Sequence, residues 1–234
     1  MAGKIALVTG GGTGIGKMIS KAFVKNGAIV YIASRTKKTL DEADASEKLV
    51  TDFKNLGNDK LDILVNNSDL IYLESLTNFP EDMWDKLFNL NVKSVFYLTI
   101  ACLPLLEKAS KKPVDPSKVI ITGSIVEIKL MQARRISSLP YNSSKFAAHG
   151  VAKNLAVHLT PRGVNVNVIA PGTVPTKPQP DKYFEISNND IPQDMAGAAL
   201  YLASGAGSWV TGTEIAVDGG HPLKFKLTDV EKLV

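Results

Sequence analysis

The chain has 234 residues and a mass of 25.2 kDa, which is enough for one large domain with a well-filled core. Hydrophobic residues make up 44% and charged residues 21%, a balance that excludes collagen-like, coiled-coil and disordered chains. The net charge of +4 is spread along the sequence, and basic residues cluster only in pairs such as Lys37-Lys38, so we expect no nucleic-acid partner.

The sequence also bears on the compartment. Cys102 is the only cysteine, so no internal disulfide can form, and residues 1–8 lack the layout of a signal peptide. No apolar run reaches the roughly 18 residues that a membrane-spanning helix needs. The three histidines lack the spacing of metal ligands. We therefore expect a cytoplasmic protein with no membrane partner and no metal.

The first 35 residues predict a strand, a glycine turn, a helix and a second strand. Residues 5–8 form an apolar run that meets a glycine cluster at once. Ile15, Ile19 and Phe23 then share one helical face, and Gly27 ends that helix. Residues 29–32 form the next apolar run, typical of a buried strand.

The same alternation continues to the C-terminus. Strands are predicted at 61–65, 119–122, 164–169 and 214–217, and helices at 83–106, 143–159 and 195–202. Strands that alternate with helices favour a parallel sheet with helices on both faces. We therefore predict an α/β fold, a doubly wound Rossmann-type parallel sheet, in a single domain spanning 1–234.

The region between the second and the next predicted strand is short. A doubly wound fold needs roughly 35 to 40 residues there for a helix, a strand and another helix. Only twenty-eight residues lie between Ile32 and Leu61, and 36–49 is polar. The third strand is therefore predicted to be short or absent, with the loss at an edge of the sheet.

The strongest local motif is the glycine-rich string T-G-G-G-T-G-I-G at 9–16, between a predicted strand and a predicted helix. Residues without a Cβ allow a tight turn whose backbone N–H groups approach a diphosphate at the positive end of the helix. This context favours nucleotide binding over a plain connecting loop.

The end of the second predicted strand bears on which dinucleotide binds. An acidic residue there would suit the ribose hydroxyls of NAD(H), whereas a basic residue suits the 2′-phosphate of NADP(H). The sequence has Ser34 and Arg35 at this point and no carboxylate. We therefore expect NADP(H) rather than NAD(H), the alternative being that Arg35 is a solvated surface residue.

Tyr141 and Lys145 lie four residues apart at the start of a predicted helix. Residues at this spacing share a helical face, so the ammonium can favour ionisation of the phenol. That would make Tyr141 a proton donor near neutral pH. Taken alone, the pair could equally be an ordinary surface pair.

Together these motifs resemble a classical short-chain dehydrogenase/reductase. The resemblance covers almost the whole chain, with the motifs in the family's order. Besides the glycine string and the Tyr141/Lys145 pair, it rests on Asn66-Asn67, Asn91, Gly123-Ser124, Pro171-Gly172 with Thr176, and Val217-Asp218-Gly219-Gly220.

The resemblance implies a set of catalytic roles. Tyr141 would protonate a carbonyl oxygen, Lys145 would assist Tyr141 and bind the nicotinamide ribose, Ser124 would polarise the carbonyl, and Asn91 would hold a water in the proton relay. The implied cofactor-binding residues are Gly10, Thr13, Gly14, Ile15, Gly16, Ser34, Arg35, Asn66, Tyr141, Lys145, Pro171, Gly172 and Thr176.

The sequence departs from the family in three places. Residues 43–46 resemble the end of the shortened third strand. Asp69 stands where the family has glycine, which should disfavour a bound dinucleotide unless the carboxylate turns outward or is paired. Ser124 and Tyr141 are seventeen positions apart, so 127–140 must loop out. The substrate lid would be 174–191.

The resemblance implies an NADP(H)-dependent oxidoreductase that reduces a small-molecule carbonyl, of ketone or 3-oxoacyl type, to a secondary alcohol. It also implies a homo-oligomer, a tetramer or dimer. The alternative function is a catalytically impaired, reductase-like binding or scaffold protein.

Overall fold

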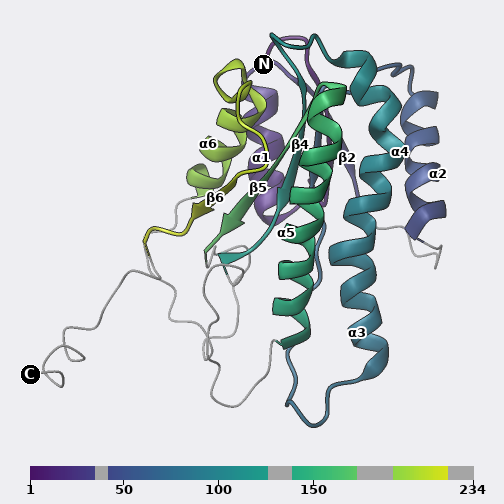
Figure 1. Ribbon diagram of the computed structural model, residues 1–234, viewed down its shortest axis with the longest axis vertical. Helices are drawn as coiled ribbons and strands as arrows, with labels where there is room; N and C mark the ends of the chain where they lie inside the picture. Colours follow the sequence, from purple (N-terminus) through teal and green to yellow (C-terminus); the bar gives the residue numbers. More distant parts are fainter. Residues whose placement is uncertain (35–41, 126–138, 173–191, 221–234) are drawn as a thin grey trace, which may run out of the picture.

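A computed structural model of the protein describes residues 1–34, 42–125, 139–172 and 192–220 (Figure 1). These residues build one six-stranded parallel sheet in the order β2-β1-β3-β4-β5-β6. The strands are β1 (Ile5–Thr9), β2 (Ile29–Ala33), β3 (Ile63–Asn66), β4 (Ser117–Thr122), β5 (Val164–Pro171) and β6 (Glu214–Val217). The predicted doubly wound α/β fold is confirmed.

Helices cover both faces of the sheet (Figure 1). One face carries α1 (Gly14–Lys25) and α6 (Pro192–Ala203), and the other carries α2 (Glu42–Asn55), α4 (Ser94–Ala109) and α5 (Leu139–Leu159). The short α3 (Glu81–Phe88) leads into α4, and two single-turn helices, η3 (Thr160–Arg162) and η4 (Gly205–Gly207), follow α5 and α6.

The inner strands of the sheet are mainly apolar because both of their faces are buried. Every residue of β3 and β5 is buried. In β1 the side chain of Leu7 packs in the core beneath α2, α4 and α5, whereas Ala6 and Val8 pack beneath α1 and α6. Successive side chains of a strand point to opposite faces, so one strand serves two cores.

β2 forms one edge of the sheet, with Ile29 and Ile32 about half exposed. Between β2 and β3 the described residues form α2 and no strand, as the short spacing predicts. The comparison of 43–46 with a strand end was wrong, because these residues lie in α2. Ser46, Val50 and Phe53 are buried at helical spacing, which explains why this segment is a helix.

The helical segment predicted at 83–106 is confirmed and is longer, running from Glu81 to Ala109. A π-helical turn, η1 (Asn89–Lys93), interrupts it between α3 and α4. By length and composition alone this segment could cross a membrane. In this fold its α4 part covers the sheet, with Leu98, Cys102 and Leu106 in the core.

The carboxyl ends of the parallel strands meet along one edge of the sheet. β1 ends at Thr9, β3 at Asn66, β4 at Thr122 and β5 at Pro171. Each of these residues belongs to, or directly precedes, a motif singled out in the sequence. In open parallel sheets ligands bind at this edge, so the topology brings the motifs together.

A buried lysine away from this edge gives a test of the packing. Lys118 in β4 is 1% exposed, and its ammonium donates a hydrogen bond to the Gly207 carbonyl over 3.3 Å. Burial lowers the pKa of Lys118 from 10.5 to about 8, with a further lowering by the charge of Lys4 that Asp115 opposes.

Because the unfolded chain holds this proton up to about pH 10.5, it binds more protons than the folded protein between about pH 8 and 10.5. The contribution of Lys118 to the free energy of unfolding therefore rises with pH across that window, by about 3 kcal/mol. Urea unfolding at several pH values should show a steeper rise for the wild type than for Lys118→Met. Parallel profiles for the two proteins would contradict the burial of a charged Lys118.

Candidate active site

The glycine string forms the turn between β1 and α1. Gly10 has φ +65°, a conformation that side chains with a Cβ rarely adopt. A Cβ on Gly16 would lie 2.5 Å from the Gly10 carbonyl oxygen and 2.5 Å from Nδ2 of Asn67. The Gly10 N–H also donates to the Ala33 carbonyl at the end of β2, over 2.7 Å. The turn is therefore held tightly against both the helix and the neighbouring strand.

The positive end of α1 opens at this turn. Thr13 is the N-cap residue and is exposed, its side chain makes no capping hydrogen bond, and the first turn of α1 has no acidic residue. Gly14 begins the helix, and Ile15 packs against the core beneath α1 and α6. Uncapped backbone N–H groups at a helix N-terminus are donors for a phosphate.

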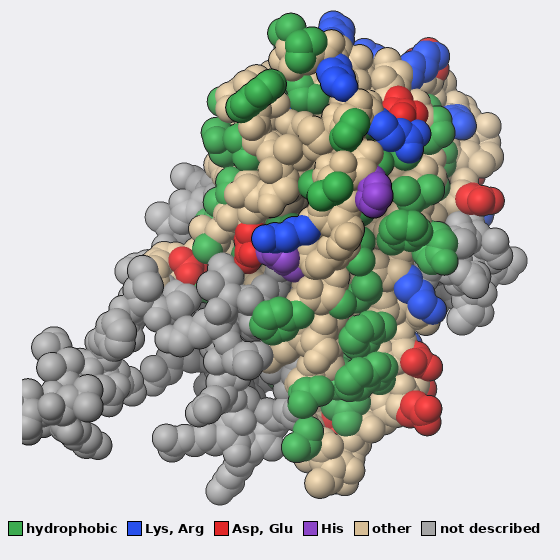
Figure 2. Space-filling view, viewed as in Figure 1, with side chains coloured by type: hydrophobic (Ala, Val, Ile, Leu, Met, Phe, Trp, Pro, Cys, Tyr) green, Lys and Arg blue, Asp and Glu red, His purple; other side chains and the backbone are tan. Residues whose placement is uncertain are grey.

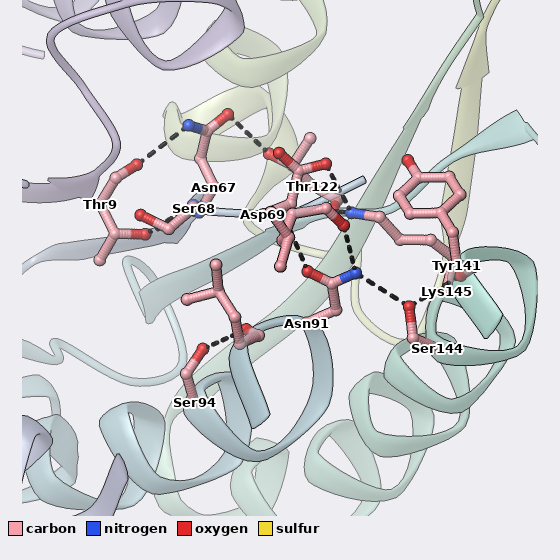
Figure 3. Close-up of polar contacts among 12 residues, drawn as sticks. Thr9, Asn67, Ser68, Asp69, Asn91, Ser94, Thr122, Tyr141, Ser144 and Lys145 are labelled. Atoms are coloured by element: carbon pink, nitrogen blue, oxygen red, sulfur yellow. Dashed lines mark hydrogen bonds and ion pairs between the residues drawn. The ribbon is translucent and has the colours of Figure 1, made fainter. Parts of the chain in front are cut away.

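Asn67 braces this loop to the centre of the sheet (Figure 3). Its Nδ2 donates to the Thr9 carbonyl over 3.0 Å, and its Oδ1 accepts from the Thr122 hydroxyl over 3.3 Å. The backbone N–H groups of Asn67 and Ser68 both donate to the Thr9 hydroxyl. Three strand ends are thus tied together. In the sequence Asn67 stands out only as part of the Asn66-Asn67 motif, with no predicted role in bracing the turn.

The side chain of Asn66 makes different contacts from that of its neighbour Asn67. Its side chain is buried, and Nδ2 donates to the hydroxyl of Thr99 in α4 over 3.1 Å. The alternation of side chains along β3 explains this, because consecutive residues point to opposite faces. The backbone of Asn66 is therefore the part that remains at the strand edge for a cofactor.

Lys145 lies at the centre of the site, where α5 meets β4 (Figure 3). Its side chain is 2% exposed. The ammonium donates to the Thr122 carbonyl at the end of β4 over 3.1 Å, and it lies 3.3 Å from Oδ2 of Asp69. It also lies 5.6 Å from the centre of the Tyr141 ring. The spacing of Tyr141 and Lys145 therefore does place the two side chains together.

Asn91 connects the helices on this side of the site. It lies in the π-helical turn η1 and is buried. Its Oδ1 accepts from the Leu70 N–H over 2.9 Å, while its Nδ2 donates to the Leu70 carbonyl and to the Ser144 hydroxyl, each over 2.9 Å. The Ser144 hydroxyl in turn donates to the Tyr141 carbonyl. Both amide hydrogens of Asn91 are thus used to hold neighbouring segments.

The remaining candidates lie at strand ends. Ser124 is buried two residues after β4 ends, and Pro171 is the last residue of β5. The Gly172 N–H donates to the Val217 carbonyl, and a Cβ on Gly172 would lie 2.8 Å from Cα of Asp218. Ser34 is exposed just after β2.

Other predicted features lie outside the described residues. These are Arg35, Thr176, most of the loop expected at 127–140 and the lid expected at 174–191.

Asp69 is the notable departure at this site, and it is paired. It follows β3 by three residues, and its side chain is 45% exposed and meets Lys145. From the sequence Asp69 is an unusual residue at this position, but its partner is not evident. The predicted parallel sheet could have indicated this partner, because it brings the ends of β3 and β4 side by side.

The residues at this edge fit a dinucleotide. The uncapped start of α1 offers N–H groups to a diphosphate. A Cβ placed on Gly12 would meet nothing within 4 Å among the described residues, so the loop leaves room above its backbone. Lys145 adds a buried positive charge at the same edge of the sheet, beside the end of β4. Asp69 is the one described carboxylate paired with that charge.

Comparison with known proteins agrees with this geometry. The family model for short chain dehydrogenases matches residues 4–183. A 3-oxoacyl-[acyl-carrier-protein] reductase of rhamnolipid biosynthesis from Pseudomonas aeruginosa is 33% identical, over 95% of this chain and 98% of its own. A 2-dehydro-3-deoxy-D-gluconate 5-dehydrogenase from Bacillus subtilis is 34% identical, over 93% of this chain and 94% of its own.

Solved structures give the same result. The NADP active-site complex of Pseudomonas aeruginosa RhlG has a TM-score of 0.82 and 32% identity, and the match covers 94% of this chain and 96% of that one. A short-chain type dehydrogenase/reductase from Mycobacterium marinum also has a TM-score of 0.82, with 26% identity over 95% of this chain and 97% of its own.

The glycine turn gives a prediction with a matched control. Gly16→Ala should lower the free energy of unfolding by about 1 to 3 kcal/mol, because the new methyl group meets backbone and the Asn67 brace. Gly12→Ala has open space around it and should change that free energy by less than about 0.5 kcal/mol. Urea unfolding of both variants checks this, and equal losses would contradict the close packing of the turn.

Proposed function

The chain belongs to the short-chain dehydrogenase/reductase family, an oxidoreductase family, and on that premise we propose that it is an NADP(H)-dependent reductase of small-molecule carbonyl compounds. The observation that carries the proposal is the position of Lys145. Its buried ammonium is held at the carboxyl end of β4 and lies beside the Tyr141 ring. A phenol and a cation so arranged at the ligand-binding edge suit proton transfer to a carbonyl oxygen.

The reaction divides between cofactor and protein. When bound, NADP(H) supplies the hydride. Tyr141 gives the proton to the carbonyl oxygen, and in the reverse direction it takes the proton from the alcohol. Lys145 stabilises the ionised phenol through its charge and binds the nicotinamide ribose. Ser124 donates a hydrogen bond to the carbonyl oxygen.

The surrounding residues keep this geometry in place. Asn91 holds the start of α5 against η1 through Ser144. We also propose that Asn91 binds a water molecule of the proton relay. Asn67 holds the glycine turn, where Gly10, Thr13, Gly14, Ile15 and Gly16 bind the diphosphate. The backbone of Asn66, together with Pro171, Gly172 and Thr176, completes the cofactor site. Positioned groups of this kind lower the barrier mainly by alignment.

The preference for NADP(H) over NAD(H) rests on Ser34 and Arg35, which follow β2 where a 2′-phosphate would lie. A similar structure is a complex with NADP. The substrate is a ketone or a 3-oxoacyl compound. The relatives include a protein named as a 3-oxoacyl-[acyl-carrier-protein] reductase and one named as a 2-dehydro-3-deoxy-D-gluconate 5-dehydrogenase.

We also propose that the protein is a single-domain, cytoplasmic homo-oligomer, either a tetramer or a dimer. Figure 2 shows hydrophobic side chains gathered along the outer surface of α4 and α5. Phe96, Tyr97 and Ile100 in α4 and Phe146 in α5 are each 40 to 45% exposed. Exposed aromatic side chains that lie on adjacent helices are typical of a protein interface.

One observation favours the alternative, a reductase-like binding or scaffold protein. The carboxylate of Asp69 forms an ion pair with Lys145, the cation that the reaction needs. Thermal unfolding with NADPH or NADH separates the two functions, because a ligand at 100 times its Kd stabilises the folded state by about 2.7 kcal/mol. The reductase should gain stability with NADPH, and less with NADH. No shift with either nucleotide at millimolar concentration would favour the scaffold.

The proton donor is tested by Tyr141→Phe. Removing the hydroxyl should lower kcat by about 100-fold or more, while NADPH binding remains, because the ring still packs beside Lys145. The assay is NADPH oxidation with a panel of activated ketones and 3-oxoacyl thioesters. Tyr201→Phe, the same change at an exposed site on α6 outside the proposed interface, is the control and should keep full activity. Retained turnover in Tyr141→Phe would refute the assignment.

A further inference from the structure

Asp69 is held in place by its own neighbour in the chain. The next residue, Leu70, has both its N–H and its carbonyl hydrogen-bonded to the Asn91 side chain, each over 2.9 Å. This two-point contact fixes the backbone immediately after Asp69. Figure 3 shows the carboxylate directed from that fixed segment toward the ammonium of Lys145. The contact between the two side chains is therefore built into the fold and is not a chance meeting of two mobile surface groups.

The two members of the pair differ in exposure. The Lys145 side chain is 2% exposed and the Asp69 side chain is 45% exposed. The cation thus lies inside and the anion lies at the solvent side. A ligand that approaches this edge of the sheet and reaches for the ammonium meets a negative charge already in contact with it.

We propose that Asp69 is a positioning residue that competes with the dinucleotide for Lys145. In the free protein the carboxylate holds the ammonium, and a nucleotide that binds must share or displace that contact. The inference rests on the proposed function, in which Lys145 binds the nicotinamide ribose. Asp69 then lowers the affinity for the cofactor, so a higher concentration of NADP(H) is needed to fill the cofactor site.

Two physical effects of the carboxylate can be separated. Repulsion between Asp69 and the phosphates of the ligand acts on any phosphorylated nucleotide and is screened by salt. Competition for the ammonium acts only on a ligand whose sugar reaches Lys145. Adenosine 2′,5′-bisphosphate carries the 2′-phosphate and the adenosine-side phosphate of NADP(H) but no nicotinamide ribose, so it reports repulsion at these phosphates without competition for the ammonium.

The test measures the Kd of NADPH and of adenosine 2′,5′-bisphosphate for the full chain by titration calorimetry. Asp69→Asn keeps the size of the side chain and removes the charge. It should bind NADPH about three- to tenfold more tightly than the wild type. Binding of the bisphosphate should change by less than about twofold. In turnover assays the KM for NADPH should fall by a similar factor.

The matched control is Asp59→Asn. Asp59 also pairs with a lysine, Lys108, over 2.7 Å, but its side chain is 73% exposed. Asp59 precedes β3, so this pair lies away from the carboxyl ends of the strands. This variant should leave both affinities unchanged. Asp69→Gly removes the side chain entirely and serves as a second variant, with the same expected gain in NADPH affinity, if the asparagine protein folds poorly.

The outcomes distinguish this inference from the proposed function. Wild-type protein that binds and turns over NADPH, with a Kd unchanged in both Asp69 variants, overturns the competition and leaves the reductase intact. Equal tightening of NADPH and the bisphosphate also overturns it, because that result indicates general repulsion. Failure of the wild type and of both variants to bind NADPH contradicts the proposed function and the inference together.

Discussion

The contact on which the site depends is the one between the Lys145 ammonium and the Thr122 carbonyl. It joins α5 to the carboxyl end of β4 and lies almost wholly out of solvent, with a side-chain exposure of 2%. A buried cation is stable only when hydrogen bonds and opposite charge replace its hydration. Thr122 and Asp69 supply these here, so the position of the charge is fixed by the strand ends and is carried into the site with the fold.

The rest of the site is arranged around that fixed charge by amide side chains. Asn67 ties the glycine turn to Thr122, and Asn91 ties η1 to the segment after β3 and to α5. Each amide can donate and accept, so one side chain can link two backbone segments. The two asparagines therefore connect the glycine turn, the ends of β3 and β4, and α5 into one polar network at the same edge of the sheet (Figure 3).

Much of this could be predicted from the sequence, and the reasons are physical. Buried parallel strands are continuous apolar runs, and glycine is required where a turn leaves no room for a Cβ, so β1, α1 and the turn between them were found correctly. The four-residue spacing of Tyr141 and Lys145 gave their shared face. The prediction for residues 43–46 was wrong because a polar stretch has no clear period. The helix α2 is indicated only by the buried positions among its described side chains, Ser46, Val50 and Phe53. The partners of Asn67 and Asp69 are far apart in sequence, and pairing across strand ends appears only once the register is known.

In the proposed arrangement Lys145 lies where the nicotinamide ribose binds, and Asp69 holds it when no cofactor is present. A crystal structure of the protein with NADP⁺ bound tests this arrangement. We predict that the Lys145 ammonium keeps its bond to the Thr122 carbonyl and turns from Asp69 toward the ribose hydroxyls, with the diphosphate over the start of α1. A nucleotide bound away from this edge, or a Lys145–Asp69 contact that is unchanged with the sugar elsewhere, would contradict this arrangement.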